Sequence, residues 1–275
     1  MTTGLKQTRA AWSELAHGYD TYVTPTHLWL GNEGIERAGL KAGESFLDIA
    51  AGSGALTIPA ARRGASVVAT DVSPAMLEQL AKRSADEGLP GIQTRVMDGH
   101  ALEFADDSFD VAGSQFGVML FPDLPRALRQ MRRVVKPGGR VLITAYGLPA
   151  RIEFLTFFLG AVKAVVPQFA GLPSDPPPLE FQIADPVILR ARLEEAGLAS
   201  VRIETVTETL RFRSAGDLWA WIASGNPIGA RLVASLSAEQ QATTREVLSG
   251  MLRERANGSD HAELTNPVNI GVGIK

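Results

Sequence analysis

Short apolar runs alternate with amphipathic segments through the first half of the chain. The apolar runs have the length and composition of strands, and they cover residues 46–49, 67–70, 92–97, 109–113 and 139–145. Between them, apolar residues recur at helical spacing. Strands that alternate with helices predict βαβ units and a parallel sheet.

The regions on either side of this alternation follow other patterns. Aromatic residues spaced through residues 10–30 indicate one or two short helices before the sheet. After Tyr146, an apolar helix at 151–166 leads into a proline-rich loop at 173–178. We interpret this stretch as a cover inserted over the edge of the sheet that binds ligands.

The C-terminal part returns to helices and strands. Helices are expected at 186–196, 215–223 and 238–254, and strands at 201–205, extending toward 212, and at 268–274. The tail 268–274 alternates apolar with small or polar residues, which suits a last strand inserted antiparallel into the sheet.

These elements predict an α/β fold with a doubly wound, mostly parallel seven-stranded sheet whose last strand is antiparallel. With 275 residues, 45% of them hydrophobic, the chain can build one main core. The expected parts are an N-terminal helical cap at 1–41, a cofactor-binding core at 42–147, a cover insert at 148–184 and, at 185–275, the C-terminal part of the core with additional cap helices.

Composition narrows the range of partners. A net charge of -3 gives no general attraction to nucleic acid or anionic lipid. One helix carries a basic cluster, interpreted as a solvated face: Arg126, Arg129, Arg132, Arg133 and Lys136. The longest apolar run, 154–166, contains Lys163 and is too short to span a bilayer.

The numbers of cysteine and histidine residues limit which redox, nucleophilic and metal sites the protein can contain. No cysteine is present, which excludes disulfides, thiolate metal sites and cysteine nucleophiles and suits a reducing cytoplasm. The four histidines show no metal-ligand spacing, so no metal is expected. The sequence leaves open whether the protein is a homo-oligomer.

A glycine-tight turn follows the first strand. Gly52 and Gly54 let the backbone approach a ligand closely, and the apolar segment 55–61 then begins a helix. The second strand ends on Asp71, placed to reach ribose hydroxyls at the carboxyl edge of the sheet. Asp98 directly follows the third strand, so it is expected at the same edge of the sheet.

Each of these residues also has a structural explanation when taken singly. Asp71 can cap a strand end, Asp98 can stabilise a turn, and Met76 can belong to the core. Ser114 and Gln115 can satisfy nearby backbone groups. Their joint occurrence at successive strand ends favours a cofactor site.

Several motifs together resemble the class I S-adenosylmethionine-dependent methyltransferases, especially small-molecule enzymes of the ubiquinone/menaquinone-biosynthesis type. The motifs are LDIAAGSG at 47–54, DVSPAML at 71–77, MDGHAL at 97–102, SFDV at 108–111 and RVVKPGG at 133–139. The resemblance is strong over 42–145, and the flanks match only loosely.

The resemblance implies S-adenosyl-L-methionine as the cofactor and assigns a role to each matching residue. Asp48 would hold the ammonium, and the turn containing Ala50, Gly52 and Gly54 would approach the cofactor with its backbone. Asp71 would accept hydrogen bonds from both ribose hydroxyls.

The resemblance also implies contacts for the two ends of the cofactor. Val72 and Met76 would sandwich the adenine, and Asp98 would accept from its amino group beside the Gly99 backbone. The remaining residues, at the methionine end, are Ser114, Gln115 and, closing over it from the N-terminal helix, Tyr19.

The implied reaction is methyl transfer to oxygen, nitrogen or carbon of a small, probably apolar acceptor. The catalytic residue is unknown, and the candidates for a general base are His17, Tyr19, His27 and His100, each with a stronger structural explanation. Acceptor selection is expected in the variable parts of the chain, whose aromatic residues include Trp29, Phe154, Phe157, Phe158, Phe169, Trp219 and Trp221.

Two other functions stay open at this point. One is a nicotinamide-dependent oxidoreductase, although Thr57 replaces the third glycine of the dinucleotide fingerprint. The other is a noncatalytic S-adenosylmethionine-binding regulator, because methyl transfer requires no invariant catalytic side chain.

Overall fold

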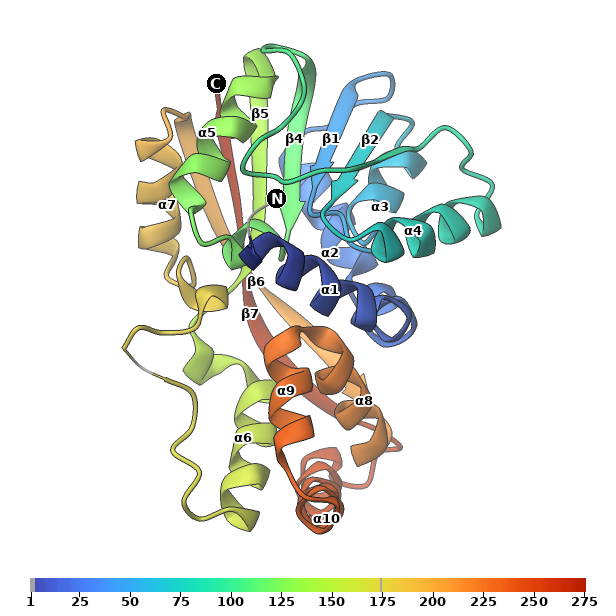
Figure 1. The fold of residues 1–275 in the computed structure, drawn as a ribbon, viewed down its shortest axis with the longest axis vertical. Coiled ribbons are helices and arrows are strands. Elements are labelled where there is room, and N and C mark those ends of the chain that lie inside the picture. Colours follow the sequence, from blue (N-terminus) through green and yellow to red (C-terminus); the bar gives the residue numbers. More distant parts are fainter. Residues whose placement is uncertain (1–2, 174) are drawn as a thin grey trace.

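A seven-stranded sheet forms the centre of the protein, with the strand order β3-β2-β1-β4-β5-β7-β6 (Figure 1). The structure is a computed structural model that describes residues 3–173 and 175–275. Residues 1, 2 and 174, which fall in the predicted cap and cover, lie outside the described residues. The strands are β1 (Ser45–Ile49), β2 (Ser66–Asp71), β3 (Gln93–Val96), β4 (Phe109–Gln115), β5 (Val135–Tyr146), β6 (Ala199–Phe212) and β7 (Ala262–Ile274).

The pairing of the strands confirms the predicted fold class. Strands β1 to β5 pair in parallel, as expected for successive βαβ units. Strand β7 lies between β5 and β6 and is antiparallel to both. The carboxyl ends of β1, β2 and β4 therefore meet at one edge of the sheet.

Helices cover both faces of the sheet and extend beyond it. They are α1 (Thr3–Gly18), α2 (Thr24–Arg37), α3 (Thr57–Arg62), α4 (Pro74–Asp86), α5 (Leu124–Val134), α6 (Glu153–Val165), α7 (Pro186–Glu195), α8 (Ala215–Gly225), α9 (Pro227–Ser235) and α10 (Ala238–Ala256). Short 3-10 turns occur at Val118–Leu120, Pro149–Arg151 and Leu179–Phe181. Helix α9 has no counterpart in the sequence-based expectation.

The N-terminal helices are longer than the one or two short helices predicted. Helices α1 and α2 form an almost unbroken segment, joined only by a π-helical turn at Tyr19–Val23. A π-helical turn is rare and is frequently found at functional sites. Helix α1 crosses in front of the carboxyl edge of the sheet (Figure 1), and this turn follows directly after it.

Alternating side chains of the strands build the core on both faces of the sheet. In β1, Leu47 and Ile49 pack on one face while Phe46 packs on the other. The same alternation in β5 directs Ile143 and Leu142 to opposite faces. This period of two fixes the register of the sheet, because a slip by one residue would expose each apolar set.

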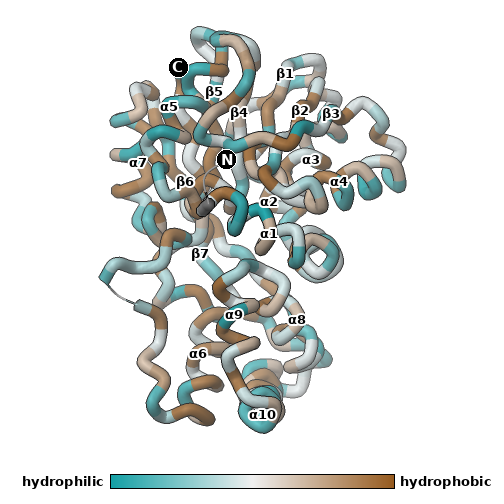
Figure 2. The backbone as a smooth tube through the Cα atoms, in the orientation of Figure 1, coloured by the Kyte–Doolittle hydropathy of each residue, from teal (hydrophilic) through white to brown (hydrophobic). Residues whose placement is uncertain are grey.

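Strands β6 and β7 run past the end of β5 and join the sheet to a group of helices. The pairing of β5 with β7 ends at Tyr146 and Val268, whereas β6 and β7 stay paired as far as Phe212 and Ala262. Helices α6, α8, α9 and α10 gather around this extension in the lower part of Figure 1. Figure 2 shows hydrophobic residues along much of α6 and hydrophilic residues over α10.

Four residues of the basic cluster belong to α5, whereas Lys136 lies at the start of β5 and not on the helix as predicted. Arg126 and Arg129 are exposed. Arg132 donates to the Gly197 carbonyl, and Arg133 donates to two backbone carbonyls of the loop after β3. Within the described residues, no helix combines the length and apolarity needed to cross a membrane.

Candidate functional site

A cavity of about 400 Å³ opens at the carboxyl edge of the sheet. Turns after β1, β2, β3 and β4 form its floor, and α1 contributes to its wall. Ten of the twelve residues predicted to bind the cofactor line it: Tyr19, Asp48, Ala50, Gly52, Asp71, Val72, Met76, Asp98, Gly99 and Gln115.

Asp48 presents a buried carboxyl group with one unused oxygen. Thr57 donates its hydroxyl to Oδ2 at 2.6 Å, whereas Oδ1 has no hydrogen-bond partner. Burial raises the pKa of the Asp48 carboxyl to about 7, with the nearby charge of Asp71 adding to the effect. Buried polar atoms are rarely left unpaired, so Oδ1 is available to a ligand donor.

Asp71 fixes the turn that carries the two glycines. Its Oδ2 accepts from the Gly52 amide at 2.9 Å, and its Oδ1 accepts from the Ser73 amide at 2.8 Å. Burial raises the pKa of Asp71. Each carboxylate oxygen keeps a further lone pair, so the side chain can still accept from a ligand in the cavity.

Asp98 and its neighbours Gly99 and His100 line one side of the cavity. Its Oδ1 accepts from the backbone amide and from Nδ1 of His100. The His100 ring lies on Phe121 with ring centroids 4.6 Å apart. A Cβ at Gly99 would stand 2.5 Å from Phe121, so only glycine fits there.

Two residues with side chains adopt left-handed backbone angles at this edge. Ala50 has a φ of 55° and Phe116 a φ of 56°. They follow adjacent strands, and both line the cavity. Non-glycine residues in this conformation store strain and gather at functional sites.

Gly54 and Ser114 lie outside the lining. A Cβ at Gly54 would stand 2.4 Å from Leu80, so its role in the structure is close packing against α4. Ser114 donates its hydroxyl to the Ile49 carbonyl and accepts from the Val118 amide. Ser114 thus ties β4 to the end of β1.

The N-terminal helix is fastened to the turns of the sheet around this cavity. Arg9 donates to the Val72 carbonyl, and the Ser13 and Ser73 hydroxyls are 2.9 Å apart. Arg83 of α4 donates to the Asp20 carboxylate at 2.6 Å and to its carbonyl. These contacts hold Tyr19 above the glycine turn, where its ring edge would lie 3.6 Å from a Cβ at Gly52.

A second cavity, of about 90 Å³, continues from the first toward the group of helices. Trp12, Tyr19, Phe116 and Leu120 line both cavities. Helices α6, α8 and α9 supply most of the remaining wall, together with Leu172, Glu180 and Phe181. Apart from a few polar groups, its surface is apolar and rich in aromatic rings.

Some of the aromatic residues expected to select an acceptor line this second cavity. Phe154, Phe158 and Trp221 do so. Trp29 is 37% exposed and lies elsewhere. Of the rest, Trp219 is buried in the core, and Phe157 and Phe169 are partly buried and pack against it.

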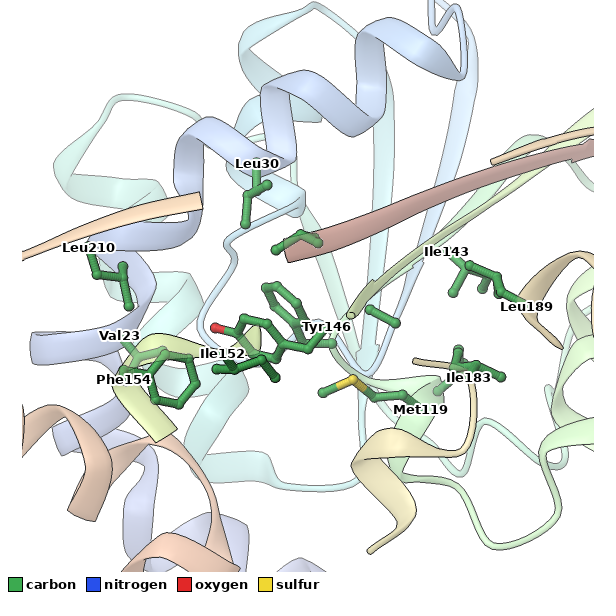
Figure 3. Close-up of a cluster of buried hydrophobic side chains, with 14 of the residues drawn as sticks. Val23, Leu30, Met119, Ile143, Tyr146, Ile152, Phe154, Ile183, Leu189 and Leu210 are labelled. Atoms are coloured by element: carbon green, nitrogen blue, oxygen red, sulfur yellow. The ribbon is translucent and has the colours of Figure 1, made fainter. Parts of the chain in front are cut away.

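A polar chain lies buried at the end of the second cavity. His27 Nε2 is 3.2 Å from the Tyr146 hydroxyl and 3.2 Å from Glu208 Oε1. Tyr146 donates to Glu208 Oε2 at 3.3 Å, and Asn266 donates to the same oxygen at 3.1 Å. Figure 3 shows the Tyr146 hydroxyl among the apolar side chains Val23, Ile152 and Phe154.

Sequence reasoning missed Tyr146 and Glu208 as site residues. A signal for Glu208 exists, because it stands in phase with Leu210 and Phe212, which are buried on the same side of β6. A glutamate at an inward position of a strand implies a buried partner. That partner, His27, is far away in the sequence.

The four candidate bases have different surroundings. His17 is exposed on α1. His100 is paired with Asp98 in the first cavity. His27 and Tyr19 line the second cavity, and burial raises the pKa of Tyr19.

Comparison with known proteins shows which families have similar sequences. A family model described as a methyltransferase domain matches residues 47–143. Demethylmenaquinone methyltransferase of Corynebacterium glutamicum is 33% identical over 192 residues, covering 68% of this chain and 79% of the relative. An uncharacterised protein of Mycobacterium tuberculosis is 36% identical over 144 residues, and the match spans 52% of this chain and only 50% of that relative's length.

Solved structures share the fold at lower sequence identity. The YcgJ protein of Bacillus subtilis has a TM-score of 0.57 and 18% identity, covering 90% of this chain and 97% of that chain. Phosphoethanolamine N-methyltransferase 2 of Haemonchus contortus, solved with S-adenosyl-L-methionine, has a TM-score of 0.54 and 21% identity, covering 90% of this chain and 52% of that chain. The sheet with its antiparallel β7, the turn motifs and the relationship to demethylmenaquinone methyltransferase place this chain in the class I S-adenosylmethionine-dependent methyltransferases of the quinone-biosynthesis type.

Proposed function

We propose that the protein transfers a methyl group from S-adenosyl-L-methionine to a small, largely apolar acceptor. The observation that carries this proposal is the pair of connected cavities. One is lined by the polar strand ends of a methyltransferase sheet, and the other is enclosed by apolar helices. Tyr19 and Phe116 stand where the two meet.

The residues of the first cavity fit this cofactor. The unpaired Oδ1 of Asp48 suits its ammonium, and Asp71 suits its ribose hydroxyls. Val72 and Met76 offer apolar surface for adenine, with Asp98 at hand for the amino group. The cofactor supplies a methyl group already activated by positive sulfur, so the chain's main task is to orient the acceptor.

The second cavity fits the acceptor. Aromatic and aliphatic side chains dominate its wall, and few polar groups are present to fix an orientation, as in most small-molecule sites. Residues 148–184 act as a cover in this proposal, since Ile152, Phe158 and Phe181 close the cavity from that segment. Gly54 and Ser114 act on the cofactor only through the turns that they hold.

The two alternatives from the sequence gain no support. Thr57 stands at the third fingerprint position and bonds to Asp48, whereas a dinucleotide site uses glycine there for close helix packing. A noncatalytic regulator would not need an enclosed acceptor cavity beside the cofactor cavity. A cytoplasmic location and the lack of a nucleic-acid partner remain predictions from composition.

Transfer of a labelled methyl group tests the function. The protein is incubated with methyl-labelled S-adenosylmethionine and a panel of apolar acceptors, with demethylmenaquinone, the acceptor named for the Corynebacterium relative, among the first. Extractable labelled product together with stoichiometric S-adenosylhomocysteine is the expected result. Cofactor binding without product across the panel would favour the regulator.

A further inference from the structure

We propose that His27 is the general base of this site and takes a proton from a hydroxyl group on a planar, phenol-like acceptor. In this proposal Tyr146 and Glu208 are positioning residues that act through His27. The inference rests on the proposed function, because it assigns the second cavity to the acceptor.

The contacts of His27 determine which nitrogen can act. Its Nε2 faces the Tyr146 hydroxyl and the Glu208 carboxylate, both at 3.2 Å. Tyr146 donates its own proton to Glu208, so the Tyr146 oxygen is an acceptor toward His27. Nε2 therefore carries the proton, and Nδ1 of the neutral ring has a free lone pair.

Nδ1 has no hydrogen-bond partner although it is buried. His27 is 2% exposed and lines the second cavity. The ring is fixed by Phe116, Tyr146 and Trp221, with centroids 4.8 Å, 6.4 Å and 6.0 Å away. A fixed imidazole with an unused acceptor nitrogen is suited to receive a proton from a bound molecule.

Glu208 provides the charge that such a step needs. It has no exposed surface, and hydrogen bonds from Tyr146 and Asn266 reach Oε2 while Oε1 faces His27. When His27 gains a proton, the imidazolium forms next to this buried carboxylate. The acidic member of a Ser-His-Asp triad orients and stabilises its histidine in the same way.

The location of the ring links it to the cofactor cavity. Gln115 lines the first cavity and donates to the His27 carbonyl at 3.1 Å. Phe116, in contact with the His27 ring, lines both cavities. The acceptor's ring would lie among the aromatic side chains, with its hydroxyl at His27.

The step balances as follows. The acceptor's O–H bond breaks and its proton goes to Nδ1 of His27. The oxygen electron pair forms a bond to the methyl carbon, and the electron pair of the breaking carbon–sulfur bond stays on sulfur. S-adenosylhomocysteine and a methyl ether result, and His27 then releases the proton to solvent.

Other titratable groups share the cavity and must be separated from His27. Tyr19 lies on the π-helical turn, and Glu180 lies in the segment 179–181 with an unpaired Oε2. Burial raises the pKa of both. Glu208 reaches His27 from β6, and Tyr146 reaches it from the end of β5.

The probe is 4-nitrophenol, whose phenolate is yellow and whose phenol is colourless. It is added to the protein saturated with S-adenosylhomocysteine, and its colour is followed as the pH is raised. The expected result is that bound probe turns yellow at lower pH than free probe. His27→Asn should remove this shift and move the transition to the pH of the free probe or above it, because an apolar cavity without a base disfavours the phenolate. Glu208→Gln should move the transition in the same direction.

Matched variants control for folding and for the other groups. His17→Asn makes the same chemical change at an exposed position. Bound 4-nitrophenol should turn yellow at the same pH in this variant as in the unmodified protein. Tyr146→Phe keeps the ring and the His27–Glu208 pair, so a shift smaller than that of His27→Asn is expected. Binding of 4-nitroanisole, which has no proton to lose, should be the same in His27→Asn as in the unmodified protein.

The outcomes separate the inference from the function on which it rests. Failure of S-adenosylhomocysteine to bind would overturn the proposed function. Three results with bound S-adenosylhomocysteine would overturn the role of His27 and leave the function standing. The nitrophenol does not bind, it binds but stays protonated, or it ionises at the same pH in His27→Asn as in the unmodified protein. Loss of ionisation in Glu180→Gln but not in His27→Asn would assign the base to Glu180 instead.

Discussion

Asp48 and Asp71 end adjacent strands and are both buried, yet they bond differently to the chain. Both oxygens of Asp71 accept backbone amides, whereas Asp48 has a single bond from Thr57. The more weakly bonded carboxyl has a pKa raised to about 7. Asp48 is therefore the residue through which cofactor binding responds to pH.

The affinity for S-adenosylhomocysteine should increase as the pH rises from about 6 to about 8. In the free protein Asp48 holds a proton below about 7, because burial and the Asp71 charge oppose ionisation. Pairing with the ligand's ammonium requires the carboxylate, so binding releases a proton. Calorimetry in buffers of different ionisation enthalpy measures this release, and Asp48→Asn should abolish both the release and the pH dependence.

Asp71→Asn should weaken binding of S-adenosylhomocysteine by about 1.5–3 kcal/mol, the range for hydrogen bonds to a charged group. The amide can accept for only one of the two backbone donors, so some stability is lost as well. Asp110→Asn is the matched control, because Asp110 bonds to Ser45 and Lys136 outside both cavities. Wild-type affinity in a folded Asp71→Asn protein would refute the ribose assignment.

At the scale of single residues, the sequence predicted the site residues that stand at the ends of successive strands. Asp48, Asp71 and Asp98 each follow a strand, and parallel strands bring such residues to one edge. Glu208 was missed because its role depends on Tyr146 and on a helix that precedes the sheet. Contacts between distant segments leave little local pattern in the sequence.

Among the elements, the N-terminal helical segment differs most from its prediction. Its path over the cofactor cavity depends on Arg83, which binds the carbonyl and the carboxylate of Asp20. Both side chains are about one-fifth exposed, so this pair is better shielded from solvent than most surface ion pairs. It anchors the π-helical turn to α4.

Arg83→Gln should loosen this segment without unfolding the sheet. Faster amide hydrogen exchange is expected in residues 3–23, with exchange in β1 and β4 unchanged, and affinity for S-adenosylhomocysteine should fall. Arg62→Gln breaks the more exposed pair with Glu87 and should change neither. Equal exchange in residues 3–23 of Arg83→Gln and wild type would contradict the anchoring role.

The strands and most helices were predictable because their apolar periodicity is local. The length of β6 and β7 was not, since their ends pair only with each other beyond β5. Helix α9 was also missed, and none of its residues is fully buried. With nine residues it makes only about two and a half turns, which is too short for a repeated apolar pattern to stand out in the sequence.

Across the whole molecule, β6 and β7 connect the sheet with the helices around the second cavity. One apolar cluster includes Leu47 of β1, Leu210 of β6 and Leu248 of α10. The two regions therefore share a core. Separate unfolding of either one would expose the apolar side chains of the other.

Unfolding in urea should accordingly be a single transition. The test uses the variant Trp12→Phe/Trp29→Phe, whose remaining tryptophans, Trp219 and Trp221, both lie in α8. Its fluorescence and its far-ultraviolet circular dichroism, which is dominated by the whole secondary structure, are expected to give the same midpoint. S-adenosylhomocysteine at about one hundred times its Kd should add about 2.7 kcal/mol to the free energy of unfolding. Two midpoints, with only one moved by the ligand, would show that the regions unfold independently.

Calorimetric titration with S-adenosylhomocysteine tests the central claim most directly, with NAD and NADP as controls under the same conditions. We predict saturable binding of the nucleoside thioether at one site per chain, with affinity in the micromolar range, and no binding of either dinucleotide. Absence of binding by the thioether, or a preference for a dinucleotide, would contradict the assignment of the first cavity to S-adenosylmethionine.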